Sequence, residues 1–198
     1  MKQLRLSNSP LLDPAFCAVV LISPEALDQT VVDPSTRATC ERAIEVLLRA
    51  AEVAEVPVFI LAQELEQKSA SSSFLPNTSS ELRFGLEPHR SPWAHRAFAD
   101  ALAAQDRTIL ILAGLWLEHE ILAAALSALV DGYDVYVLLD GSAPRSPLAS
   151  VTARERLTQA GGTPITTSQV ISEWSFETTD TSLRAELIAL LRVLLDIK

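Results

Sequence analysis

The chain has 198 residues, 48% of them hydrophobic and 21% charged, which excludes a disordered chain and allows one sizeable core. The net charge of -9 disfavours nucleic acid and anionic membrane surfaces, since both are also negative. Two cysteines are too few for a disulfide scaffold. We find no secretory leader and no apolar stretch of membrane-spanning length, so we expect a soluble, cytoplasmic protein.

Strand-like and helix-like segments alternate along the chain. In chain order, the patterns predict a strand at 16–22, a helix at 33–56, a strand at 56–62, a short strand at 81–86, a helix at 91–106, a strand at 108–114, a helix at 117–132, a strand at 133–140, a helix at 146–162, a short edge strand at 163–166 and two final helices at 168–175 and 180–197. This alternation predicts an α/β protein: a three-layer α/β/α arrangement with a central, mostly parallel sheet.

We expect one domain over residues 1–198, with an N-terminal extension at 1–15 and a C-terminal helix within 178–198. The Ser-rich stretch 66–81 predicts a long surface loop. Cys17 opens an apolar strand and Cys40 lies in a helix, so both are interpreted as small core residues.

The segment Glu118-His119-Glu120 opens the helix that follows the strand at 108–114. In open α/β sheets, ligands and catalytic groups gather where a strand leads into a helix. His119-Glu120 resembles the start of a zinc-protease helix, but the second histidine that this motif needs at position 123 is an alanine. The chain has three histidines and no closely spaced cysteine pair, so we predict no metal site and no cofactor.

Two interpretations of Glu118 and Glu120 remain open. Acidic side chains in the first turn of a helix are stabilised by the helix dipole, by about 0.3–1 kcal/mol each. Alternatively, Glu120 points into a cleft at the strand end and takes part in chemistry. The sequence contains neither a phosphate-binding glycine loop nor the strand-turn-helix serine motif of the hydrolases. These motifs therefore do not decide between the two interpretations.

Several segments together resemble the isochorismatase-like cysteine hydrolase superfamily, in particular its YcaC-type, nicotinamidase-related branch. The resemblance runs from about Phe16 to Trp174 and is carried by "AVVLISPEALDQ", "SPWAHRAF", "AGLWLEHEILAAALSALVDGYDVYVLLDGSA" and "ARERLTQAGGTPITTSQVISEW". The family pattern has an Asp at the end of the first strand, a Lys or Arg before the Trp-containing helix, and a Cys nucleophile at the start of the helix after the central strand.

The resemblance implies that these three catalytic positions are all substituted here. The nucleophile position falls on Glu120, the Asp position on Ser23 and the basic position on Leu86. Glu120 is a weak nucleophile beside a thiolate, and Ser23 needs a partner base to move a proton near pH 7. Arg90 and His89 are close enough to Leu86 that a local shift in the alignment would supply a cation.

Three functional hypotheses follow. The first is a catalytically degenerate member of the family that acts by binding or assembly, with a pocket lined by Glu25, Arg90, Trp93, Trp116 and His119. The second is a divergent hydrolase of a small amide or related metabolite that uses Glu120 as a general base, assisted by His119, Glu25 or Arg90. The third is a structural subunit whose Leu-rich C-terminal helix forms an interface.

The expected partners are a small-molecule ligand and further copies of the same chain. The resemblance implies a homo-oligomer of at least two subunits. We expect neither nucleic acid nor membrane to be bound, for the reasons of charge and hydropathy given above.

Overall fold

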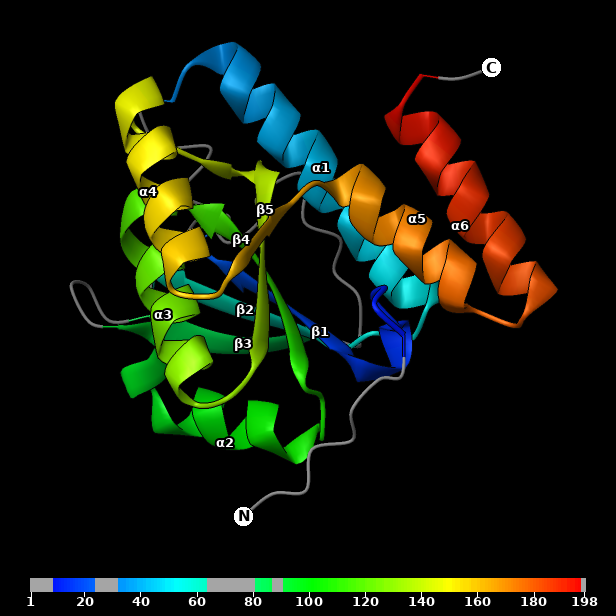
Figure 1. The fold of residues 1–198 in the computed structure, drawn as a ribbon, viewed down its shortest axis with the longest axis horizontal. Coiled ribbons are helices and arrows are strands. Elements are labelled where there is room, and N and C mark those ends of the chain that lie inside the picture. Colours follow the sequence, from blue (N-terminus) through cyan, green and yellow to red (C-terminus); the bar gives the residue numbers. More distant parts are fainter. Residues whose placement is uncertain (1–8, 24–31, 64–80, 87–90, 197–198) are drawn as a thin grey trace, which may run out of the picture.

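The computed structural model describes residues 9–23, 32–63, 81–86 and 91–196. Their core is a six-stranded sheet in the order β3-β2-β1-β4-β5-β6, and each pair of neighbouring strands is parallel (Figure 1). The strands are β1 (Cys17–Ile22), β2 (Val58–Gln63), β3 (Glu81–Leu86), β4 (Ile109–Leu115), β5 (Asp134–Ala143) and β6 (Thr163–Ile165). The α/β prediction is therefore confirmed, and the described sheet is parallel throughout.

Helices cover both faces of this sheet. One face packs against α1 (Pro34–Val53) and α5 (Thr167–Glu177), on which α6 (Thr181–Leu194) packs in turn. The other face packs against α2 (Arg96–Ala104), α3 (Leu122–Val130) and α4 (Pro147–Gln159). The side chains of β1 alternate between the two apolar clusters, with Val19 and Leu21 in one and Val20 and Ile22 in the other. A strand that is buried on both faces appears in the sequence as a continuous run of apolar residues. These strands could therefore be predicted from the sequence.

Some helices and strands begin or end at residues other than the predicted ones, because tertiary contacts determine these boundaries. The predicted helix at 91–106 is divided into a 3₁₀ turn, η3 (Pro92–Ala94), and α2, because His95 Nδ1 accepts a hydrogen bond from the Phe98 N–H and caps α2. The predicted helix at 117–132 begins as one π-helical turn, η4 (Leu117–Ile121). β5 continues three residues beyond the predicted Asp140, to Ala143.

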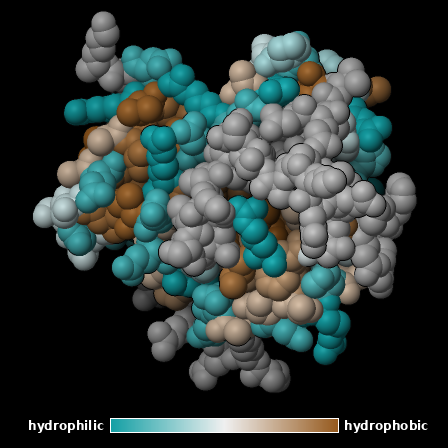
Figure 2. All heavy atoms as spheres, turned by 180° about the vertical axis from the view of Figure 1, so that it is seen from behind, coloured by the Kyte–Doolittle hydropathy of each residue, from teal (hydrophilic) through white to brown (hydrophobic). Residues whose placement is uncertain are grey.

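The C-terminal helix docks on its own domain. Leu187 of α6 is fully buried, and Leu183, Leu190, Leu191 and Leu194 pack against the same apolar cluster. Apolar side chains of α5, α6 and the residue after α6 nevertheless remain exposed, namely Phe176, Ile188, Val193 and Leu195. Figure 2 shows brown, hydrophobic atoms at the surface on the side of the molecule where α6 lies.

Most of the predicted loop at 66–81 falls outside the described residues, apart from Glu81, which opens β3. Within the described ranges, no helix is both long and apolar enough to cross a membrane.

Gly114 sets the distance between β1 and β4. Its φ angle is +129°, and a Cβ atom built there would lie 2.0 Å from the Ile22 carbonyl oxygen. Any larger residue would force the two central strands apart, so the close approach at this point requires glycine.

Replacing Gly114 by alanine is expected to lower the free energy of unfolding by more than about 3 kcal/mol, because a backbone clash adds to the cost of a positive φ. The matched control is Gly132→Ala, where φ is +87° but no neighbouring atom of the described residues lies within 4 Å of the added Cβ. That control should cost only about 1–2 kcal/mol. Urea denaturation compares the two, and equal losses would contradict the steric argument.

Both cysteines should be unreactive in the folded protein. Cys17 and Cys40 are buried, and burial is the main cause that raises the pKa of each thiol to about 12. A thiol reagent at pH 8 should therefore label the native chain far more slowly than the denatured chain.

The same shifts predict alkaline destabilisation. Unfolded thiols ionise near pH 9 whereas the folded ones hold their protons, so stability present below pH 9 is lost as the pH rises towards 12. Burial also raises the pKa values of Tyr133 and Tyr136, which adds to the effect. The variant Cys17→Ala/Cys40→Ala should lose less stability over this range, and an unchanged pH dependence would refute the thiol contribution.

Candidate functional site

The carboxyl ends of β1, β4 and β5 lie side by side at one edge of the sheet. In the strand register, Ile22 is paired with Gly114, which is in turn paired with Ser142. Ser23, the turn η4 and Ser142 are thereby brought to the same edge. This edge of a parallel sheet is where α/β proteins place their ligands.

Ser23 follows the last residue of β1 and is 3% exposed. Its φ angle is +47°, and its backbone N–H donates a 2.7 Å hydrogen bond to the Leu61 carbonyl of β2. Its hydroxyl has no hydrogen-bond partner within the described part of the chain. Ser23 therefore has no base there that would let it transfer a proton.

Glu120 lies in η4, partly buried, directly after β4. Its Oε2 accepts a 3.3 Å hydrogen bond from the Trp116 N–H, which is the backbone group at the start of the turn. The peptide bond between Leu115 and Trp116 is cis. The carboxylate thus accepts a hydrogen bond from the backbone at the start of its own turn, where the helix dipole also favours a negative charge.

Leu86 ends β3 and is 5% exposed. It belongs to an apolar cluster that includes Phe59 and Phe98. These aliphatic and aromatic neighbours would strip water from a charge placed here, so the position suits the leucine that occupies it.

The side chains predicted to line one pocket are only partly brought together. Trp116 lies between β4 and η4, and His119, with a side chain 55% exposed, has its Nε2 4.0 Å from Glu118 Oε1. Trp93 instead donates from Nε1 to Asp131 Oδ2 at 2.5 Å, beyond the C-terminal end of α3. At the usual helical rise per residue, Asp131 lies about 16 Å from Glu120 along the helix axis. Glu25 and Arg90 lie outside the described residues.

Two residues that the sequence analysis did not place in the pocket belong to this edge. Glu118 is 14% exposed, its Oε1 accepts a 3.2 Å hydrogen bond from the Arg145 N–H, and its buried Oε2 has no partner among the described residues. The Arg145 guanidinium carbon lies 4.7 Å from the centre of the Trp116 ring. Arg145 follows β5 immediately before the Ser146 cap of α4, a position that ordinary loop residues also occupy.

Asp140 is a structural carboxylate near the same edge. Both of its oxygens accept hydrogen bonds from the Thr167 N–H, at 3.0 and 3.1 Å, and Oδ1 also accepts from the Thr167 hydroxyl. Burial raises the pKa of Asp140, and these hydrogen bonds partly oppose the shift. Asp140 therefore joins β5 to the start of α5.

No thiol reaches the site. Cys17 opens β1 at the opposite edge of the sheet, roughly 20 Å from Ser23 at the usual rise of a strand. Cys40 is buried in α1, where burial and, to a smaller extent, the Asp140 charge raise its pKa to about 12. Among the described residues, no group of three or more His, Cys, Asp or Glu side chains is arranged to hold a metal ion.

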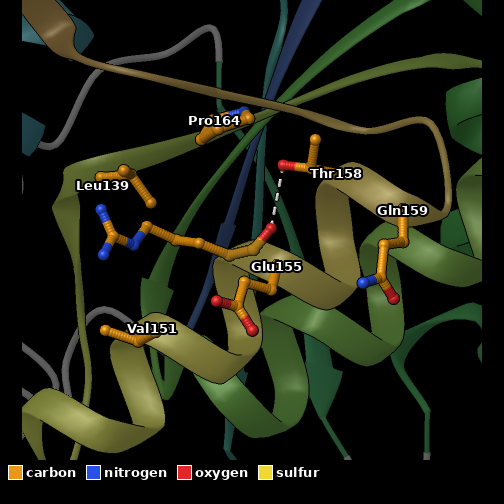
Figure 3. Close-up of a pocket in the computed structure, with 7 residues that line it drawn as sticks. Leu139, Val151, Glu155, Thr158, Gln159 and Pro164 are labelled. Carbon is orange, nitrogen blue, oxygen red and sulfur yellow. Dashed lines mark hydrogen bonds between the residues drawn. The ribbon is translucent and has the colours of Figure 1, made fainter.

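A separate hollow of about 470 Å³ lies between α4 and the edge strand β6 (Figure 3). Its lining includes Leu139, Val151, Arg154, Glu155 and Pro164. Figure 3 shows Thr158 bonded to the Arg154 carbonyl, so this hydroxyl is committed to its own helix. None of the predicted site residues that the structure describes lines the hollow, and its described lining presents no activated nucleophile.

Comparison with known proteins agrees with this architecture. An isochorismatase domain model matches residues 19–169. A probable hydrolase, YcaC from Escherichia coli strain K12, is 36% identical over 69 residues, which are 35% of this chain and 33% of that protein. The matched segment thus spans only a third of this relative.

Solved structures share the fold over almost the whole chain. The E. coli YcaC gene product, described as an octameric hydrolase of unknown specificity, superposes with a TM-score of 0.77 at 21% identity and covers 96% of this chain and 97% of its own. YcaC from Pseudomonas aeruginosa, solved with hexane-2,5-diol and covalent acrylamide, gives 0.76 at 18% identity and 97% of both chains. MAR1 ribonuclease from Caenorhabditis elegans gives 0.70 at 18% identity and 91% of both.

The domain match covers most of the chain, and the sheet order and helix layers accompany it. The chain belongs to the isochorismatase family.

Proposed function

We propose that this chain is a non-catalytic member of its family, which binds a small molecule at the carboxyl edge of the sheet and leaves it intact. The observation that carries the proposal is the hydrogen bond from the Trp116 N–H to Glu120 Oε2. The group at the expected nucleophile position is a carboxylate that caps its own turn. A carboxylate at this position is also a weak nucleophile beside the thiolate that the family uses.

The other two positions support the same conclusion. Leu86 lies among apolar side chains and contributes no charge, and Ser23 has a hydroxyl without a base in the described region. Acyl transfer by this family's route needs a nucleophile, a proton carrier and a supporting cation together. With all three groups replaced, the chain lacks the means for acyl transfer by this route. The polar edge of the sheet that remains is able to bind a small molecule.

Buried polar atoms at this edge favour binding. The hydroxyls of Ser23 and Ser142 and Oε2 of Glu118 are buried without hydrogen-bond partners among the described residues. Such atoms are rare in native proteins and are usually satisfied by water or a ligand. A small polar molecule, or water held beneath it, would supply the missing partners.

A second candidate is the divergent hydrolase that uses Glu120 as a general base. Its favourable observation is position: Glu120 is partly buried directly after β4 at the ligand-binding edge of the sheet. The 3.3 Å bond to Trp116 is long enough that a substrate water could compete for the carboxylate.

One hydrolysis panel separates the two functions. Nicotinamide, other simple amides and isochorismate are incubated with the wild-type chain and with Glu120→Gln, which keeps the size of the side chain. We expect no turnover above buffer with either protein. Turnover by the wild type that disappears in a folded Glu120→Gln variant would overturn the proposal and establish Glu120 as a base.

The variant Ser23→Asp/Leu86→Lys/Glu120→Cys serves as a comparison in the same panel. It restores the three residue types of the family pattern on this scaffold. We also propose that the chain self-associates, in line with the octamer described for E. coli YcaC. Light scattering of the native chain tests this, and a monomer would contradict it.

A further inference from the structure

The site holds two carboxylates, Glu118 and Glu120, and a leucine at the position where a cation was expected. A positive charge is present at the same edge from another element, because Arg145 follows β5 and lies over Trp116. We propose that Arg145 is the anion-binding group of this site and that the ligand carries a single carboxylate. This inference rests on the proposed binding function and names the class of ligand.

Contacts on two sides hold Arg145 in place. Its backbone N–H donates to Glu118 Oε1, which ties the segment after β5 to η4. Its guanidinium lies over the Trp116 ring at 4.7 Å, and the backbone of Trp116 is itself bonded to Glu120. Both the backbone and the side chain of Arg145 are therefore positioned by residues of the site.

The Arg145 guanidinium, whose carbon lies 4.7 Å from the centre of the Trp116 ring, makes no hydrogen bond to any described residue. A guanidinium over an aromatic ring uses its flat face, while its five N–H donors point outwards in its own plane. Arg145 is exposed and makes no ion pair with any described residue. The in-plane fork matches the two oxygens of a carboxylate.

The neighbouring charges favour a ligand with one negative charge. Glu118 and Glu120 lie in the turn beside Trp116, so an anion that approaches Arg145 also meets their repulsion. A dianion such as phosphate meets this repulsion twice over. A monocarboxylate presents one charge to one cation and is the better match.

The experiment compares benzoate with benzamide, which have the same ring and differ in charge. Dissociation constants are measured by ligand-observed NMR at constant ionic strength, with inorganic phosphate as a third probe. We expect the wild type to prefer benzoate over both benzamide and phosphate. In Arg145→Gln the affinity for benzoate should fall by about tenfold or more, while that for benzamide stays unchanged.

Two further variants sharpen the test. Arg145→Lys keeps the charge but loses the planar fork, so its affinity for benzoate should be intermediate. Arg154→Gln removes an exposed arginine of α4 that lines the separate hollow, and it should bind as the wild type does. Thermal unfolding of each variant confirms that the fold is kept.

A preference for benzoate that survives in Arg145→Gln, or is lost equally in Arg154→Gln, overturns the assignment. Benzamide binding without a preference for benzoate also overturns it, but leaves the proposed binding function standing. Tighter binding of phosphate refutes the monocarboxylate class. Release of benzoate from benzamide contradicts the non-catalytic function instead, so the two failures are distinguishable.

Discussion

The contact between the Ile22 carbonyl and Gly114 is the constraint on which the site depends. A Cβ atom at position 114 would lie 2.0 Å from that oxygen, so β1 and β4 can approach this closely only at glycine. β5 is aligned on the other side of Gly114 through Ser142. The register at this point fixes where Ser23, η4 and the segment up to Arg145 lie, and all of them form one edge.

In our proposal, the chemistry at that edge differs from the family's chemistry in charge as well as in residue type. A thiolate mechanism needs an anionic nucleophile supported by a nearby cation. Here the turn carries two carboxylates, and the described cation, Arg145, comes from the end of β5 and rests on an aromatic ring. In our proposal this arrangement holds an anion in place, whereas it offers no route to an acyl intermediate.

Much of the fold could be predicted because it depends on local periodicity. Strands buried on both faces gave continuous apolar runs, and caps such as Asp33 at the start of α1 marked helix ends. The division of the 91–106 helix was not predicted, because it depends on the His95 side chain turning back to cap Phe98. The extension of β5 was missed because Asp140 interrupts the apolar run, although Thr167 satisfies its carboxylate.

The site was harder to predict than the fold, because its members come from distant parts of the chain. The resemblance to the family predicts its catalytic positions at Ser23, Leu86 and Glu120, but it could not show that Trp93 would bond to Asp131 beyond the far end of α3. Arg145 gave no signal in the sequence, since its importance comes from the Trp116 ring beneath it. The role of each side chain at this edge therefore depends on contacts between distant segments of the chain. A local sequence pattern does not predict such contacts.

The most direct test of the account is a time course of proton NMR spectra, recorded while the native chain is held for a day with a mixture of small amides and carboxylates. Binding and turnover are then observed in one sample. We expect saturation-transfer signals for carboxylates, with the concentration of every compound constant. An amide signal that declines while its acid grows at the same rate would contradict it.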